Sequence, residues 1–523
     1  MKATWLLLRN KLAQVKPGTA ALVFFAAYLL LGILLFDDYG VSTDEIFQID
    51  KSRITLDYVL GRNDDLLSYA DRHYGALFPL ILQSANSFFT DTRAIFLYRH
   101  LATFLFFYFS TVAFYFLLRR LRFNGWIALC GTAMLIFHPH IFAHSYYNPK
   151  DIPFLSMWVY ALLSLAWWSE KPGCIWRACL HGLVTGLLVV FRLPGVMMWA
   201  ISGLVMLVLV IMLTTPLKKA AFAFGAFLVA SFGALYIFLP TLWHNPIGEF
   251  ITFLSMSPFE WTGKELFMGQ FYKVDKLPAY HWLVYFILTT PLLYHAFFLL
   301  GTGGWVARIR RADPETMRLA ALRLLPLGLS VLILLATHPK VYNGWRHVLF
   351  LYPMFVILAL DGLVLGWQFL RRAFPIRWAG WVLVSSLGMQ ALVLAAFLIQ
   401  SHPYEFTYYN WLAGRKLSAV RNDYIMDYWG LAYTEAFMRI AQMDDRAEIK
   451  VETEYLISAE QNLMMVPADM RARIKLIPQN SDERFDYYIS TFREYVPIER
   501  KNMKLVDSIT VRDLTVAGIY THK

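Results

Sequence analysis

Charged residues are scarce in this 523-residue chain. Asp, Glu, Lys and Arg make up 16% of the sequence, whereas 58% is hydrophobic and the mean hydropathy is +0.46. An average soluble protein has about 25% charged residues. The deficit excludes an ordinary soluble protein and indicates a polytopic membrane protein. The aromatic content of 17% is typical of a protein with extensive belts at the membrane interface.

Cysteine is also rare, and several familiar motifs are missing. The three cysteines, Cys130, Cys174 and Cys179, cannot build a disulfide framework, so we expect free thiols. There is no internal repeat, no low-complexity tract, and no Walker, Rossmann or Ser-His-Asp pattern, so nothing indicates nucleotide binding. The first apolar run, 20–36, precedes acidic residues instead of a small-residue cleavage site, which predicts a retained first span.

Long apolar runs dominate the first 400 residues. A helix needs roughly 20 mostly apolar residues to cross a bilayer, and about eleven runs approach that length. The run 178–191 is short, and Arg192-Leu193-Pro194 separates it from the next run, which fits a helix end. The predicted spans are 19–36, 95–118, 126–145, 152–168, 178–191, 194–213, 220–240, 282–300, 320–337, 347–366 and 378–399.

The basic residues predict the orientation of these spans. Lys and Arg cluster in the N-terminus and in every second connection, and cytoplasmic loops carry such an excess. The net charge of +11 therefore marks topology, and no nucleic-acid partner is expected. We predict a multi-pass membrane protein with a cytoplasmic N-terminus; the bacterial cytoplasmic (inner) membrane is the location that the family resemblance described below implies. The basic residues concerned are Lys2, Arg9, Lys11, Lys16, Arg119, Arg120, Arg122, Lys171, Arg177, Lys218, Lys219, Arg308, Arg310, Arg311, Arg318, Arg323, Arg371, Arg372 and Arg377.

Two regions on the predicted outer face have their own organisation. The loop 37–94 holds two apolar-patterned stretches, 45–60 and 74–89, which we expect to be helices along the interface. Residues 401–523 change character: they contain short strand patterns and one helical pattern. The predicted fold is thus an all-α polytopic domain over 1–400 and a small extracytoplasmic α/β domain over 401–523. The strands are expected at 448–452, 473–477 and 486–489, and the helix at 433–443.

Two predicted outer connections carry candidate catalytic acids. Asp44 and Glu45 follow the first span, where a carboxylate could remove a proton from an acceptor hydroxyl or amine. The alternative is a solvated loop that simply carries many acids. Asn148, Lys150 and Asp151 share one tight turn between two spans. Helix capping explains Asp151 alone, but not its two neighbours.

Basic groups gather where positive charge is disfavoured. They lie on the predicted outer side, mostly in the connection 337–347, and such groups call for an anionic partner. A polyprenyl phosphate or pyrophosphate would supply it, and so would anionic lipid headgroups in general; the sequence leaves both open. The candidate substrate-binding residues are Asn148, Lys150, Arg192, His338, Lys340, Tyr342, Arg346 and His347.

Two further patterns have simpler explanations. His138, His140 and His144 crowd the end of one span, and the last two share a helical face, a spacing that can ligate a metal. No closing ligand is evident, so no metal is assigned, although a divalent ion is one alternative. The tyrosines of 402–410 fit an aromatic belt.

Together these motifs resemble the GT-C membrane glycosyltransferases. The likeness is to bacterial relatives of the dolichyl-phosphate-mannose protein mannosyltransferases and to the lipid A aminoarabinose transferases. It covers about residues 1–410 and rests on the order and shared face of short motifs. These motifs are Asp44-Glu45, Asn148-Pro149-Lys150-Asp151, Tyr342-Asn343-Gly344-Trp345-Arg346-His347 and His402-Pro403-Tyr404.

The resemblance implies a fold of 11–13 spans and an inverting transfer of a sugar, hexose or pentose, from polyprenyl phosphate. It makes Asp44 the base and Asp151 a residue that orients the acceptor or the base. It also implies that Arg346, with Lys340 and Arg192, holds the leaving phosphate. No outer loop is long enough for the β-trefoil domain of the protein mannosyltransferases, so the acceptor, whether lipid, glycan or protein, stays open.

Two other classes of function compete with this interpretation. A transporter or flippase for envelope glycolipids would place ionisable groups near the bilayer midplane, often in two related halves. Here the polar groups lie at helix ends and no halves repeat. A non-catalytic assembly protein for envelope polysaccharide is the third option.

Overall fold

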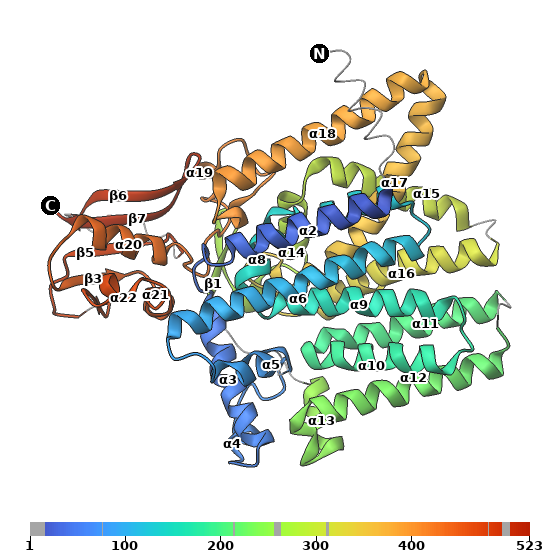
Figure 1. The fold of residues 1–523 in the computed structure, drawn as a ribbon, viewed down its shortest axis with the longest axis horizontal. Helices are drawn as coiled ribbons and strands as arrows, with labels where there is room; N and C mark the ends of the chain where they lie inside the picture. Colours follow the sequence, from blue (N-terminus) through green and yellow to red (C-terminus); the bar gives the residue numbers. More distant parts are fainter. Residues whose placement is uncertain are drawn as a thin grey trace.

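A computed structural model describes residues 16–75, 77–212, 215–255, 263–309, 313–479, 481–493 and 503–523. Long helices run roughly side by side, and a small domain with a β-sheet lies at one end of them (Figure 1). We call this end the domain end and the opposite end, on the right in Figure 1, the basic end.

The helices are α2 (Pro17–Leu35), α3 (Thr43–Val59), α4 (Asp65–Ser68), α5 (Leu77–Asn86), α6 (Thr92–Arg120), α7 (Gly125–Ile136), α8 (Pro139–Tyr147), α9 (Asp151–Ser169), α10 (Ile175–Phe191), α11 (Met197–Ile211), α12 (Leu217–Phe238), α13 (Pro246–Ser255), α14 (His281–Thr289), α15 (Leu292–Ile309), α16 (Pro314–Thr337), α17 (Tyr352–Ala373), α18 (Ile376–Ser401), α19 (Leu417–Val420), α20 (Tyr433–Met443), α21 (Leu456–Leu463) and α22 (Ala468–Arg471). Short 3₁₀ helices are η1 (Leu193–Val196), η2 (Pro240–Trp243), η3 (Val274–Lys276), η4 (Arg346–Leu351) and η5 (Glu405–Thr407). The strands are β1 (Lys264–Phe267), β2 (Gln270–Lys273), β3 (Ile449–Thr453), β4 (Ile474–Ile477), β5 (Tyr487–Ser490), β6 (Met503–Val511) and β7 (Leu514–His522).

The apolar helices agree with a membrane protein of many spans. Within the described residues, eight helices are long and apolar enough to cross a membrane, and ten spans result if each bent pair counts as one. The bent pairs are α7 with α8, at 65°, and α14 with α15, at 114°. The predicted run 178–191 is α10, whose 17 residues fall just short of a comfortable crossing. The count of about eleven spans therefore stays a prediction.

Close backbone contacts hold the bundle together, as expected where lipid provides no hydrophobic drive between helices. Gly362 on α17 and Gly301 on α15 face one another, and a Cβ at Gly362 would overlap the carbonyl oxygen of Phe297. The glycines let α15 and α17 pack backbone against backbone.

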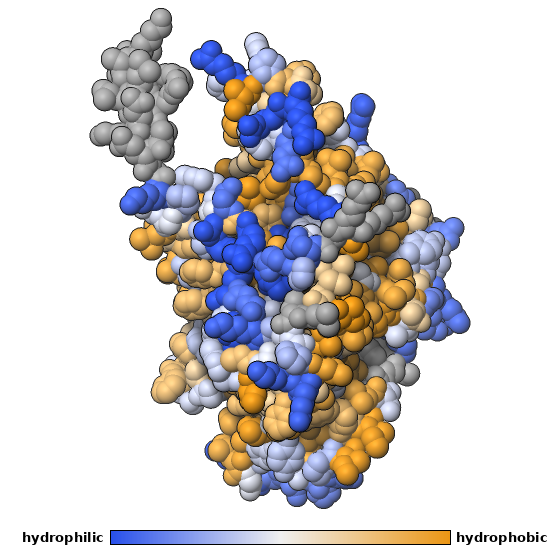
Figure 2. Space-filling model, turned by 90° about the vertical axis from the view of Figure 1, so that its right-hand side faces the viewer, coloured by the Kyte–Doolittle hydropathy of each residue, from blue (hydrophilic) through white to orange (hydrophobic). Residues whose placement is uncertain are grey.

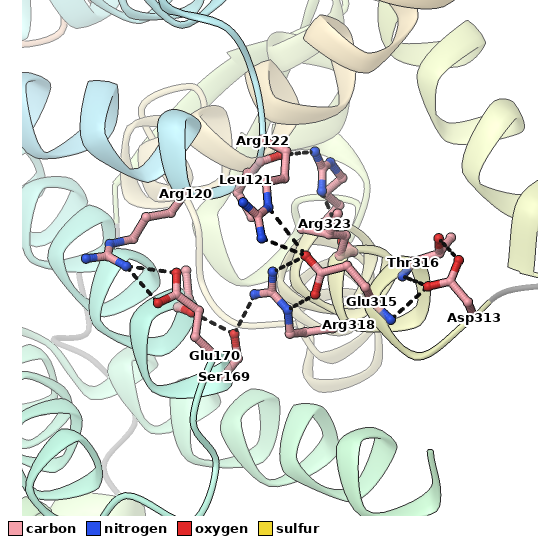
Figure 3. A network of polar contacts seen from close by, with 12 residues as sticks. Arg120, Leu121, Arg122, Ser169, Glu170, Asp313, Glu315, Thr316, Arg318 and Arg323 are labelled. Atoms are coloured by element: carbon pink, nitrogen blue, oxygen red, sulfur yellow. Dashed lines mark hydrogen bonds and ion pairs between the residues drawn. The ribbon is translucent and has the colours of Figure 1, made fainter. Parts of the chain in front are cut away.

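Basic residues of alternate connections do meet at the basic end. Figure 2 faces this end and shows hydrophilic side chains across its middle with hydrophobic ones around them. Arg120 of α6 donates to Glu170 after α9, at 2.8 and 2.9 Å, and Glu315 of α16 pairs with Arg318 at 2.7 Å and Arg122 at 3.4 Å (Figure 3). This gathering is what the positive-inside pattern predicts; which compartment the end faces stays a prediction. Lys2, Arg9, Lys11, Arg310 and Arg311, on which that prediction also drew, lie outside the described residues.

The C-terminal domain has the predicted α/β character. Its five-stranded sheet has the order β4-β3-β5-β7-β6, with β4, β3 and β5 parallel and β7 antiparallel to both neighbours. The three predicted strands and the helix α20 are confirmed to within a residue or two. The sequence analysis missed the hairpin of β6 and β7, as well as the small hairpin of β1 and β2 between α13 and α14.

The domain fixes the chain that leads into α3. The Asn462 side chain accepts from the Val41 N–H at 2.9 Å and donates to the Val41 carbonyl at 3.0 Å. The hydroxyls of Thr43 and Ser458 lie 3.1 Å apart. The predicted helices of the first loop are present as α3 and α5, and α3 begins where the domain meets the bundle (Figure 1).

Candidate active site

The start of α3 is built by a capping box. Glu45 accepts from the Ser42 N–H at 3.0 Å, and the Ser42 hydroxyl donates to the Tyr147 carbonyl at 2.7 Å. Glu45 is fully buried, and its Oε1 lies 3.2 Å from Nε2 of His100. The box fixes the first turn of the helix, and Asp44, one residue earlier, points in a different direction.

The turn between α8 and α9 orients a second carboxylate. The side-chain oxygen Oδ1 of Asn148 accepts from the backbone N–H groups of Lys150 at 3.2 Å and Asp151 at 2.8 Å. Its amide group donates to Oδ2 of Asp151 at 3.0 Å. Asn148 thus shapes the turn and holds the Asp151 carboxylate at the start of α9.

Arg346 joins the two carboxylates. Its Nη1 lies 2.7 Å from Oδ2 of Asp44 and 3.2 Å from Oδ2 of Asp151, although 302 and 195 residues separate the partners in sequence. The guanidinium is buried, 5.0 Å from the ring centre of Trp429 and 5.2 Å from that of Tyr342. Two aromatic faces therefore keep a buried cation in place.

Three further cations surround the ring of Tyr74. Lys150 lies 4.5 Å, Lys51 5.2 Å and Arg192 5.5 Å from its centre. Arg192 also donates to the Tyr74 hydroxyl at 2.8 Å and pairs with Asp151. Lys150 lies 3.6 Å from Asp44. We call Lys51, Lys150, Arg192 and Arg346 the cation cluster.

The cluster has more positive charge than its direct partners neutralise. Lys150, Arg192 and Arg346 face two carboxylates, Asp44 and Asp151, which leaves a net charge of +1, and Lys51 adds to this excess when it is protonated. The Nζ of Lys51 is buried and has no hydrogen-bond partner among the described residues. Burial lowers the pKa of Lys51 to about 7, with Lys150 acting in the same direction and Asp71 against it. Such a group favours an anion beside it.

The two carboxylates differ in access. The Asp151 side chain is 1% exposed, whereas that of Asp44 is 19% exposed. Burial raises the pKa of Asp44, but the charges of Arg346 and Lys150 outweigh burial and lower the pKa to about 2. Conversely, burial lowers the pKa of Lys150, but Asp44 together with Tyr74 and Tyr342 outweighs burial, so the pKa of Lys150 is raised overall. Asp44 is therefore an ionised carboxylate that solvent or an acceptor can reach.

A third buried carboxylate shapes the turn before Arg346. Glu265, at the hairpin of β1 and β2, accepts from the backbone N–H groups of Asn343 at 2.6 Å and Gly344 at 3.0 Å. Both residues have positive φ, of 56° and 71°, which favours Asn and Gly there. Burial raises the pKa of Glu265 to about 7 against these two hydrogen bonds.

Comparisons with known proteins gave matches among solved structures alone. A scan against protein-family models and a search of curated proteins each gave no match. Among solved structures, the chain is similar to ArnT from Cupriavidus metallidurans bound to undecaprenyl phosphate, with a TM-score of 0.49 and 13% identity over 96% of this chain and 98% of that one. It is also similar to the archaeal oligosaccharyltransferase AglB from Archaeoglobus fulgidus in complex with an inhibitory peptide and a dolichol-phosphate. That match has a TM-score of 0.45 and 10% identity over 90% of this chain and 70% of that one.

Both proteins are members of the GT-C superfamily, the group that the motifs resemble.

The structure brings most of the predicted site residues together. Asp44, Asn148, Lys150, Asp151, Arg192 and Arg346 form one hydrogen-bonded and ionic network, with Tyr342 against Arg346 and His347 beside Tyr342. Glu45 serves the capping box, and Asp151 is enclosed by Arg192, Arg346 and Asn148. Asp44 is thus the more accessible of the three candidate acids. His338 is exposed at the end of α16, and Lys340 is half-buried in the following segment.

The three histidines near the site have separate partners. His138 approaches Thr290 at 3.4 Å, His140 the Tyr408 carbonyl at 3.0 Å, and His144 both Asn148 and Tyr428. Within the described part of the chain, no group of three His, Cys, Asp or Glu side chains is placed to hold a metal ion.

Lys51, Tyr74, Glu265 and Trp429 are site residues that the sequence analysis missed. Lys51 had a usable signal, because it lies seven residues after Asp44 and so shares its helical face. The other three come from separate connections or from the C-terminal domain and left no such signal.

Proposed function

We propose that this chain is an inverting glycosyltransferase that moves a sugar from polyprenyl phosphate to an acceptor at a membrane surface. The observation that carries the proposal is the combination of a buried cation cluster with an excess of positive charge and one accessible carboxylate, Asp44, at the ends of apolar helices. A binding site for phosphate and a base for an acceptor are thereby next to each other.

The cluster has the chemistry of a phosphate site. Arg346 and Arg192 present planar guanidinium groups, which suit the oxygens of phosphate, and the two lysines add point charges. Because the cluster lies at the ends of the apolar helices, a phosphate carried on a lipid chain can reach it from the membrane. A soluble nucleotide sugar gains nothing from that position.

The reaction follows from this placement. Asp44 takes the proton of an acceptor hydroxyl or amine while the acceptor atom forms a bond to the anomeric carbon. The bond between that carbon and the phosphate oxygen breaks, and its electron pair leaves with polyprenyl phosphate. The phosphate passes from one negative charge to two. The cations hold that growing charge in a site with little water, where such stabilisation is strongest.

Donor binding also prepares the base. Without donor, Arg346 and Lys150 are engaged with Asp44 and keep its pKa at about 2, which is low for a base. A phosphate competes for the same two cations and adds a negative charge beside Asp44. Both changes raise the pKa of Asp44, so the carboxylate becomes a better base when the donor is present.

Asp151 acts as a positioning residue in this scheme. It ties Arg192 and Arg346 together from a buried position, at the start of α9. Its charge keeps two like charges close to one another before the phosphate arrives.

The test separates chemistry from binding. In Asp44→Asn, sugar transfer from synthetic polyprenyl-phosphate sugars should fall by about 10²- to 10⁴-fold, the usual contribution of a general base. Binding of undecaprenyl phosphate, measured by native mass spectrometry, should persist or strengthen, because a competing negative charge is gone. Asp50→Asn is the matched control: it removes the same charge from an exposed position on α3.

Two outcomes would overturn the proposal. Full transfer by Asp44→Asn would remove Asp44 as the base. Movement of a glycolipid across the membrane without any sugar transfer by the native protein would favour the transporter.

A further inference from the structure

A second site lies at the basic end, on the opposite side of the bundle from Asp44. A groove of about 830 Å³ runs between α6, α9 and α10. Helix α9 links the two regions, since Asp151 begins it and the groove reaches Glu170 just after its end. At 1.5 Å per residue, about 27 Å of this helix separates Asp151 from the mouth of the groove, while the wall of the groove begins at Met157, about 9 Å from Asp151.

The walls of the groove are apolar. Phe116 comes from α6, Met157 and Leu163 from α9, and Leu180 and Val184 from α10. All three helices are apolar segments, so these walls face lipid and not water. The size is in the range of ligand pockets, which hold about 300–1,000 Å³.

The mouth of the groove is basic. It is lined by Arg119, Arg120, Arg122 and Glu170, so three guanidinium groups face one carboxylate, a net charge of +2. Glu170 is already bound by Arg120 (Figure 3). Arg122 is 71% exposed, and its Nε and Nη2 both lie 3.4 Å from one oxygen of Glu315, whereas Arg119 donates one N–H to the carbonyl of Phe123. Most donors of these two side chains point to no other described residue.

We propose that this groove binds an anionic phospholipid, with its phosphate at Arg119 and Arg122 and an acyl chain along α9. Charge and shape favour the same occupant: a basic mouth attracts the headgroup, and apolar walls accept the chain. Basic pockets between membrane helices on the cytoplasmic side bind anionic headgroups in this manner. Trp167, at the mouth, supplies an aromatic ring at the depth of the headgroups.

The experiment compares lipids that differ only in headgroup charge. The purified, delipidated full chain is mixed with dioleoyl phosphatidylglycerol or dioleoyl phosphatidylcholine, and retained lipid is counted by native mass spectrometry. The native protein should retain phosphatidylglycerol preferentially. Each Arg near an anionic headgroup contributes about fivefold in affinity, so Arg119→Gln with Arg122→Gln should weaken retention about 25-fold.

Two further variants make the result specific. Arg371→Gln with Arg372→Gln removes the same charge from exposed positions in the last turn of α17, outside the groove, and should leave retention unchanged. Leu180→Trp fills the groove without a change in charge and should reduce retention by at least about fivefold. Size-exclusion profiles report whether each variant is folded.

Three results would overturn the proposal. They are equal retention of the two lipids by the native protein, an equal loss in the Arg371 and Arg372 control, and full retention by Leu180→Trp. Displacement of the lipid by 10 mM inorganic phosphate alone would also overturn it, because the acyl chain would then contribute nothing.

Discussion

Lys51 allows a test in which a structural role and a ligand-binding role predict opposite signs. Its amine is buried without a hydrogen-bond partner, in a cluster that already has a positive excess. Lys51→Met keeps most of the apolar stem and removes the charge. If Lys51 waits for an anionic ligand, the variant should stabilise the ligand-free protein and weaken ligand binding. A structural lysine would do the reverse on stability.

The magnitude follows from the pKa of Lys51. Burial lowers it from 10.5 to about 7, a difference of about 3.5 units. The folded protein therefore binds fewer protons than the unfolded chain between pH 7 and 10.5, and its stability rises with pH in that window. At 1.36 kcal/mol per unit, the penalty is about 5 kcal/mol below pH 7. It decreases to about 1 kcal/mol by pH 9.5. Lys51→Met should thus be more stable at pH 6.5, and this advantage should shrink by pH 9.5.

The loss of binding can be bounded in the same way. A charge about 6 Å from a phosphate contributes about 0.7 kcal/mol even in water, and several-fold more in a protein. Undecaprenyl phosphate should therefore bind at least about threefold more weakly to Lys51→Met.

The assay is the apparent melting temperature of the purified chain in detergent at one heating rate, at pH 6.5, 8.0 and 9.5, together with native mass spectrometry of bound undecaprenyl phosphate. Lys218→Met, at an exposed position on α12, is the control and should change neither quantity. A lower melting temperature for Lys51→Met at pH 6.5, or unchanged lipid binding, would refute the reasoning.

Three other positions give predictions of their own. Protonation of Glu265 removes the charge at which two backbone N–H groups point, so native transfer activity should rise with pH through about 7. Glu265→Gln should be less active, and its pH–rate profile should lack that inflection. The same inflection in the profiles of the native protein and of Glu265→Gln would show that another group titrates there. Asn462→Ala leaves the buried N–H and carbonyl of Val41 without partners, at a cost of about 2–4 kcal/mol. A melting temperature of Asn462→Ala equal to that of the native protein would contradict this role of the Asn462 side chain. Gly362→Ala should destabilise the bundle because its Cβ overlaps the neighbouring helix, whereas Gly366→Ala has its nearest contact at 4.0 Å and should be tolerated. Equal melting temperatures for Gly362→Ala and Gly366→Ala would contradict this prediction, because α15 would then have shifted to admit the added Cβ.

Several features could be predicted because their cause is local. The length of an apolar run and the number of basic residues in a connection depend only on the composition of that segment. Most membrane spans and the gathering of arginines at one end of the bundle were therefore predictable. Short strand patterns likewise predicted β3, β4 and β5, and a helical pattern predicted α20. The hairpin of β6 and β7 was missed because its pairing depends on partners outside the segment.

Neighbours in sequence did not share a role. Asp44 and Glu45 are adjacent acids at a helix start, and the sequence treats them as a pair. In the first turn of α3 they point about 100° apart, so one faces the cations and the other closes the capping box. Only the helix geometry separates the two.

The sequence by itself determined that this chain is a membrane protein with acidic and basic groups at one set of helix ends. Tertiary structure alone decided which of these groups meet. Arg346 reaches Asp44 across 302 residues, and Trp429 reaches Arg346 from the C-terminal domain. The excess charge around Tyr74 exists only because three connections converge there. The sign of a side chain's charge and the length of a helix are local properties of the chain. The electrostatic field at one point of the site is instead the sum over every charged group that folding brings near that point.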